Sequence, residues 1–264
     1  MTSTNELLSI ALRAAREAGD EIVRLYDTVA FDTKSDGSPV TIADTQAHNI
    51  ILKHLNTTLI PVLSEESTGM PLPYPARLWI IDPLDGTRDF LNKTGDFSVM
   101  IGLLEEGRPT LGVVYAPLLD LLTYARRDEG AFMLHAGVTT QLQVASTVAH
   151  PLRFVCSVNN FTPYMEAVTE KLSAQKTPRG SIGIKASLLA QNKGDFFFSW
   201  GNFGEWDICA PQIIATESGL VVTDAHGDPI HYGTKENRVE HGILFSHPHC
   251  FTHVQEAIAT TPHP

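Results

Sequence analysis

Cysteine is scarce in this sequence, and no apolar run is long enough to span a membrane. The chain has 264 residues and 3 cysteines, which lie far apart and in no CxxC or zinc-ligand spacing. This excludes a disulfide framework as the basis of the fold and makes a reducing cytoplasm the expected compartment. Residues 1–27 mix acids and bases. We therefore expect neither a signal peptide nor a membrane association.

Basic residues are also few. The sequence has 19 Lys and Arg against 30 Asp and Glu, which gives a formal net charge of -11. Because nucleic-acid polymers are bound chiefly by clustered Lys and Arg, this balance argues against such a partner. It does not exclude a small phosphorylated metabolite, since carboxylates hold divalent cations that attract phosphate. For most of the acids, solubility is a sufficient explanation.

Repeats and low-complexity linkers are absent too, so the organisation must be read from periodicity. The capping-box pattern from Ser3 to Glu6 and the apolar spacing that follows predict a helix over residues 3–27. A polar turn at 34–39 and a second helix through Ile50 and Leu55 come next.

The second part of the chain has a different pattern. Val-, Leu- and Tyr-rich runs at 97–104, 111–115 and 121–125 predict antiparallel strands. After about residue 140, strands alternate with helices. We therefore expect an α+β fold, with an N-terminal α+β sub-domain over 1–140 that carries most metal ligands and a C-terminal α/β sub-domain over 141–264 that carries Asp207 and the substrate contacts.

Two acids three residues apart follow a buried strand. Leu78–Ile81 predicts this strand, and Asp82-Pro83 is expected to stop it. With Asp85 and the carbonyl of Leu84, Asp82 offers the oxygen ligands that Mg²⁺ prefers. The amides of Gly86 and Thr87 would begin a helix, where a phosphate oxygen binds well.

Each acid also has a plain structural explanation. Asp82 would end a strand, and Asp85-Gly86 would form an ordinary tight turn. Glu65, which follows the apolar run 59–63, would be a solvated acid. Asp44 and Asp207 precede helical patterns and would serve as N-caps. Only the joint pattern favours a metal cluster.

Three separated blocks, WIIDPLDGTRDF, LSEES and WDICAPQIIATESG, occur in an order and spacing that resembles the inositol monophosphatase superfamily. The resemblance covers nearly the whole chain. It implies a layered α/β/α/β/α sandwich, of the type shared with fructose-1,6-bisphosphatase, and a magnesium-dependent, lithium-sensitive phosphatase. It also implies site residues: the metal ligands would be Glu65, Asp82, Leu84 (through its carbonyl), Asp85 and Asp207, and the catalytic residues Asp44, Thr87 and Glu65.

The mechanism implied needs two or three Mg²⁺ ions. Glu65, Asp82 and the Leu84 carbonyl would hold one, and Asp82, Asp85 and Asp207 a second. A third, weaker ion would lie near Glu65 and Asp44. Thr87, oriented by Asp44, would hydrogen-bond the attacking water.

The nature of the substrate depends on weaker signals. Segments at 34–41, 96–99, 112–117 and 180–185 resemble the 3'(2'),5'-bisphosphate nucleotidase branch, which converts adenosine 3',5'-bisphosphate to AMP and phosphate. The predicted substrate contacts are Gly86, Thr87, Ser181, Lys185 and Asp207. Lys185 would meet the second phosphate, although a solvated helix residue is an equal alternative. Trp200 or Phe203 would either stack on a base or pack within the protein.

Other functions stay open. An inositol-1-phosphate or other sugar-phosphate phosphatase is the nearer alternative, although the stretch before Trp206-Asp207 lacks the acid that the inositol branch uses for substrate hydroxyls. A catalytically silent metal- or phosphate-binding module is the alternative of another class. The oligomeric state is open as well, a homodimer included.

Overall fold

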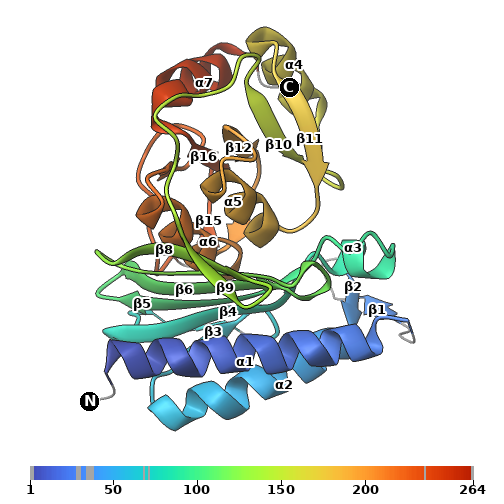
Figure 1. Ribbon diagram of the computed structural model, residues 1–264, viewed down its shortest axis with the longest axis vertical. Helices are drawn as coiled ribbons and strands as arrows, with labels where there is room; N and C mark the ends of the chain where they lie inside the picture. Colours follow the sequence, from blue (N-terminus) through green and yellow to red (C-terminus); the bar gives the residue numbers. More distant parts are fainter. Residues whose placement is uncertain are drawn as a thin grey trace.

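The structure is a computed structural model that describes residues 3–27, 31–33, 39–67, 69–70, 72–234 and 236–262. Helices α1 and α2 cover one face of a large sheet, α5 and α6 lie between this sheet and a second one, and α4 and α7 cover the far side (Figure 1). This arrangement confirms the predicted layered α/β/α/β/α sandwich. The helices are α1 (Thr4–Leu25), α2 (Ile42–Leu55), α3 (Thr87–Leu91), α4 (Pro163–Leu172), α5 (Ile182–Ala190), α6 (Glu205–Glu217) and α7 (Pro248–Thr260).

The larger sheet has the strand order β3-β4-β5-β6-β7-β8-β9. Strands β3 and β4 are parallel, and each later pair is antiparallel. Three of its members confirm the antiparallel strands predicted from the Val- and Leu-rich runs. The strands are β3 (Val62–Ser64), β4 (Arg77–Asp85), β5 (Ser98–Glu105), β6 (Arg108–Ala116), β7 (Leu121–Arg126), β8 (Gly130–His135) and β9 (Val138–Leu142).

The second sheet has the order β11-β10-β12-β16-β14 and mixes both directions. Strand β10 is parallel to β11 and β12, whereas β16 is antiparallel to β12 and β14. Its strands are β10 (Arg153–Ser157), β11 (Gln175–Arg179), β12 (Phe196–Ser199), β14 (Val221–Thr223) and β16 (Ile243–Ser246). Two small ladders join β1 (Phe31–Thr33) to β2 (Pro39–Thr41) and β13 (Phe203–Gly204) to β15 (Arg238–Val239).

The N-terminal helices begin where capping residues place them. Ser3 caps α1 by accepting a hydrogen bond from the amide of Glu6 at 3.3 Å. Thr41, not Asp44, is the N-cap of α2; Asp44 is the third helical residue and completes the capping box. The prediction that Asp44 is itself the N-cap is therefore wrong, because Thr41 occupies that position. Most of the polar turn predicted at 34–39 lies outside the described residues.

Strand β4 does not stop at Pro83, which corrects the sequence prediction. It continues to Asp85, and its register with β5 shifts between Asp82 and Asp85, as in a β-bulge. A bulge tolerates proline because the extra residue needs no ladder hydrogen bond. The strand thus carries both acids into the interior.

Two glycines allow α6 to lie close against the larger sheet. Gly102 of β5 pairs with Gly112 of β6. A Cβ atom added at Gly102 would lie 2.6 Å from Sγ of Cys209, and one added at Gly112 would lie 2.6 Å from the carbonyl oxygen of Ala210. The helix that carries Asp207 is therefore seated on the sheet that carries Asp82 and Asp85.

Replacing Gly112 with alanine is expected to lower the free energy of unfolding by about 1–3 kcal/mol, because the added methyl group would overpack this contact. Urea unfolding followed by circular dichroism measures the change. Thr139→Ala on the exposed face of β9 is a matched control and should stay within about 0.5 kcal/mol of the wild type. A Gly112→Ala protein as stable as the control would contradict this account of the packing.

The remaining expectations concern cysteine, membranes and sub-domains. Cys156, Cys209 and Cys250 are free, as predicted, and all three are buried. Among the helices of the described ranges, none combines the length and apolarity needed to cross a bilayer. The two large sheets use residues 62–142 and 153–246. A division into 1–140 and 141–264 remains our proposal.

Candidate active site

Three carboxylates meet at the end of strand β4. Oxygen atoms of Asp82, Asp85 and Asp207 all lie within 4.8 Å of one another. The first two come from the bulged end of β4, and Asp207 comes from the first turn of α6. Segments more than a hundred residues apart in the sequence therefore meet at one point, as the joint pattern of acids predicted.

Local backbone geometry fixes the two acids of β4. The amide of Leu84 donates to Oδ1 of Asp82 at 2.9 Å, which closes a tight turn around Pro83. Gly86 follows with φ of 95°, and a Cβ atom there would lie 2.8 Å from the carbonyl oxygen of Asp96. Only glycine fits this position without strain.

Asp207 is held differently. It is the third residue of α6, and its Oδ2 accepts a hydrogen bond from the amide of Gly204, the N-cap, at 2.7 Å. The prediction that Asp207 is itself the N-cap is therefore wrong, because Gly204 occupies that position. Asp207 nevertheless stabilises the start of the helix. Its neighbour Glu205 anchors this start by accepting from the hydroxyl of Tyr74 at 2.8 Å and from the amide of Gly233 at 3.0 Å.

The N-terminus of α5 restrains Asp85. Its Oδ2 accepts a hydrogen bond from the hydroxyl of Ser181 and another from the amide of Gly183 at 3.0 Å. The Ser181 oxygen also accepts from the amide of Ile184 at 3.1 Å. Ser181 thus orients a predicted metal ligand, and its contact with substrate stays a prediction.

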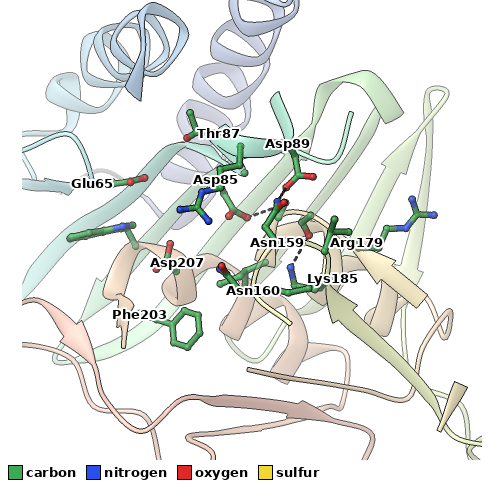
Figure 2. A pocket seen from close by; sticks show the side chains of 18 of the residues that line it. Glu65, Asp85, Thr87, Asp89, Asn159, Asn160, Arg179, Lys185, Phe203 and Asp207 are labelled. Atoms are coloured by element: carbon green, nitrogen blue, oxygen red, sulfur yellow. Dashed lines mark hydrogen bonds between the residues drawn. The ribbon is translucent and has the colours of Figure 1, made fainter. Parts of the chain in front are cut away.

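Glu65 comes from the chain that leaves β3. Its amide donates to the carbonyl oxygen of Ile81 at 3.2 Å, which ties this chain to β4. Figure 2 shows the Glu65 side chain on the same side of the pocket as Asp207. Glu65 also lies close enough to Asp82 for its charge to raise the pKa of that carboxylate. It is not merely a solvated acid.

The predicted pair of Asp44 and Thr87 is present. The hydroxyl oxygen of Thr87 lies 3.1 Å from Oδ1 of Asp44 and 3.2 Å from the carbonyl oxygen of Leu84. The other oxygen of Asp44 accepts from the amide and the hydroxyl of Thr41, at 2.7 and 2.6 Å. Asp44 is 1% exposed. The capping box of α2 therefore fixes the carboxylate that positions Thr87.

Burial and mutual repulsion make the carboxylate cluster electrostatically unfavourable without a cation. Burial raises the pKa of Asp82 well above its ordinary value, and the charges of Glu65, Asp85 and Asp207 raise it further. The pKa of Asp207 is raised in the same way, by burial first and then by Glu65 and Asp85. A divalent cation would turn this repulsion into attraction, so the donor set fits a metal ion that binds oxygen.

Lys185, on α5, lies close to the Asp85 carboxylate. It is 2% exposed, and its Nζ donates to the carbonyl oxygen of Gly180 at 2.8 Å. Burial lowers its pKa to about 8, against the opposing effect of the carboxylates of Asp85, Asp89 and Asp96. The alternative of a solvated helix residue is therefore wrong. Its contact with a phosphate stays a prediction.

A pocket of about 540 Å³ opens over the carboxylates. Figure 2 shows Glu65 and Asp207 on one side of it and Arg179 on the other, with Asn159 between them. Phe203 lines this pocket, whereas Trp200 packs edge-on against Tyr164, with ring centroids 5.6 Å apart. Of the two aromatic residues considered for base stacking, Phe203 is the better placed.

Sequence reasoning missed several residues of the pocket. Asp89 accepts from Nδ2 of Asn159 at 2.6 Å and from the hydroxyl of Thr94 at 2.8 Å. Asp89 belongs to the same motif as Asp82 and Asp85, which was a usable signal. Asn159 had none, because it follows an ordinary strand. The pocket residues missed are Ser67, Arg88, Asp89, Ser157, Val158, Asn159, Asn160, Arg179, Ile182, Phe197, Asn202 and Arg238.

Comparison with known proteins identifies the family. A sequence model of the inositol monophosphatase family matches residues 3–258. The 3'(2'),5'-bisphosphate nucleotidase CysQ of Salmonella typhimurium is 35% identical over 244 residues, which are 90% of this chain and 98% of that protein. CysQ of Escherichia coli K12 is 34% identical over 247 residues, 91% of this chain and 99% of that protein.

Solved structures agree. CysQ from Bacteroides thetaiotaomicron superposes with a TM-score of 0.77 at 30% identity, covering 90% of this chain and 96% of that one. The IMPase of Thermotoga maritima gives 0.82 at 25% identity, covering 96% and 97%. The fold, the acidic cluster and these relatives together show that the chain belongs to the inositol monophosphatase family of metal-dependent phosphatases.

Proposed function

We propose that this phosphatase is a 3'(2'),5'-bisphosphate nucleotidase that converts adenosine 3',5'-bisphosphate to AMP and phosphate. One observation carries the proposal: the cluster of Asp82, Asp85 and Asp207 faces a pocket in a chain whose relatives named as this nucleotidase are 29–35% identical over most of its length. The partner is then a small phosphorylated metabolite in the cytoplasm, and not a nucleic-acid polymer or a membrane.

Mg²⁺ is the proposed cofactor, with two or three ions. Glu65, Asp82 and the Leu84 carbonyl would hold one, and Asp82, Asp85 and Asp207 a second, with a weaker site near Glu65. When bound, the ions supply Lewis-acid stabilisation of the charge that develops on the phosphoryl and leaving oxygens.

The protein groups position the reactants. The Thr87 hydroxyl, held by Asp44, orients the attacking water, and Glu65 supports the same water from the end of the neighbouring strand β3. The amides of Gly86 and Thr87 receive oxygens of the reacting phosphate. Ser181 keeps the Asp85 carboxylate in place. Lys185 and Asp207 complete the proposed substrate contacts.

Phosphate release from adenosine 3',5'-bisphosphate and from inositol 1-phosphate, assayed in parallel with Mg²⁺, tests the proposal. We expect kcat/KM to favour the bisphosphate by about tenfold or more, because a second anionic contact is worth about 1.5–3 kcal/mol. Chelation of the metal should stop release, and Li⁺ should inhibit it.

Each other outcome has a definite meaning. Preference for inositol 1-phosphate would replace the proposal by the sugar-phosphate alternative. Release from neither substrate at any metal concentration would favour a silent metal- or phosphate-binding module. Equal release with and without chelator would contradict the metal site.

A further inference from the structure

Arg179 lies at the side of the pocket away from the carboxylate cluster. It is the last residue of β11, where it pairs with Ser157 of β10, and both residues line the pocket. In Figure 2, Asn159 separates Arg179 from Asp207. The pocket therefore has an acidic side, suited to metal and a reacting phosphate, and an opposite edge where the Arg179 side chain lies.

The guanidinium group makes one long contact with a neighbouring carboxylate, which leaves most of its N–H donors available to a ligand. Its Nη1 lies 3.5 Å from Oδ1 of Asp96, at the limit for an ion pair, and the Arg179 side chain is 44% exposed. Within the described part of the chain, Asp96 is the one side-chain partner recorded for it. The second oxygen of Asp96 accepts from the amide of Gly180 at 3.0 Å. A planar fork of donors held in this way can bind a phosphate through two parallel hydrogen bonds.

The other cations of the pocket are placed differently. Lys185 is buried against the carbonyl of Gly180 and faces several carboxylates, which offset its charge. The guanidinium of Arg238 lies over the ring of Trp206, 5.6 Å from its centroid, beside Asp207. Arg88 follows Thr87 in α3, at the acidic side. Arg179 is the exposed cation that lies opposite the predicted metal ligands.

Only a few residues of the chain separate Arg179 from a residue that contacts the carboxylate side of the pocket. Ser181, two residues after Arg179, donates to Asp85. Gly180 between them is tightly enclosed, since an added Cβ atom would lie 2.5 Å from the carbonyl oxygen of Asp96 and 2.6 Å from Oδ2 of Asp89. This enclosure fixes the backbone between Arg179 and Ser181, and so the place of Arg179 relative to Asp85.

We propose that Arg179 binds the phosphate that is not hydrolysed and thereby sets the preference for bisphosphates. The inference rests on the proposed function and adds a specificity-determining residue to it. Removing the guanidinium should weaken recognition of the second phosphate and leave the reaction at the first one unaffected.

The test compares Arg179→Met, Arg179→Lys and the wild type on adenosine 3',5'-bisphosphate and on adenosine 3'-monophosphate. For Arg179→Met we expect kcat/KM to fall about tenfold or more on the bisphosphate and to change less than about twofold on the monophosphate. Arg179→Lys should recover part of the loss, since it restores charge without the bidentate geometry. Arg13→Met, on the exposed face of α1, is the matched control and should leave both substrates unaffected.

A binding measurement tests the role of Arg179 without relying on catalytic turnover. AMP keeps the second phosphate, so its affinity for metal-free protein, measured by calorimetry, should fall about tenfold in Arg179→Met. Equal losses on both nucleotides would instead mean that Arg179 only positions the loop, and no change in either assay would also overturn the inference. A wild type that does not favour the bisphosphate over inositol 1-phosphate would overturn the proposed function itself.

Discussion

Asp82→Asn is expected to abolish phosphate release, with kcat lowered by about 10³-fold or more, while the protein remains folded. Asp82 is 1% exposed and is the carboxylate shared by both proposed metal sites. Asparagine keeps its shape and its hydrogen bond from the amide of Leu84. It removes the negative charge that would hold the cations, so the loss falls on catalysis and not on packing.

Thermal unfolding provides the control for this variant. Without metal, Asp82→Asn should melt at the same temperature as the wild type or higher, because burial and then the charges of Glu65, Asp85 and Asp207 raise the pKa of Asp82 and so disfavour its charged form. With Mg²⁺, the wild type should gain more thermal stability than the variant. Asp20→Asn on the exposed side of α1 should leave kcat unchanged. A variant at Asp82 that kept wild-type turnover would contradict the metal site.

The residues whose meeting at one point could be predicted from the sequence are those encoded by short motifs. Asp82 and Asp85 lie three residues apart after a buried strand, and Thr87 follows directly. Their proximity can be predicted from the sequence because a single turn brings them together. The end of β4 was mispredicted because Pro83 normally terminates a strand, whereas here the bulge accommodates it.

The remaining features depend on contacts between distant segments. The sequence left Lys185 equally open as a phosphate contact or a solvated helix residue. Its burial follows only from the packing of α5 against the acids of β4 and the 89–96 segment. Arg179 ends a strand with no distinguishing local pattern. Its position opposite the carboxylates arises because β11 pairs with β10 in the second sheet while β4 belongs to the first. Neither fact has a local signal.

Replacing Thr87 with valine is expected to lower kcat by about 10²–10³-fold, because the hydroxyl that would orient the attacking water is lost. Asp44→Asn should have a smaller effect, since an amide oxygen can still accept from Thr87. The activation constant for Mg²⁺ should change little in either variant. Thr139→Val on the exposed face of β9 is the matched control.

The double variant distinguishes a positioning pair from two independent groups. If Asp44 acts only by orienting Thr87, Asp44→Asn should add almost nothing to the loss caused by Thr87→Val. Asp44 also completes the capping box of α2 through Thr41, at 2.7 and 2.6 Å. A loss of about 0.5–2 kcal/mol in unfolding free energy is therefore expected for Asp44→Asn, but not for Thr87→Val. Strictly additive losses in kcat would mean that Asp44 contacts the reacting groups directly, and the proposed route through Thr87 would then be wrong.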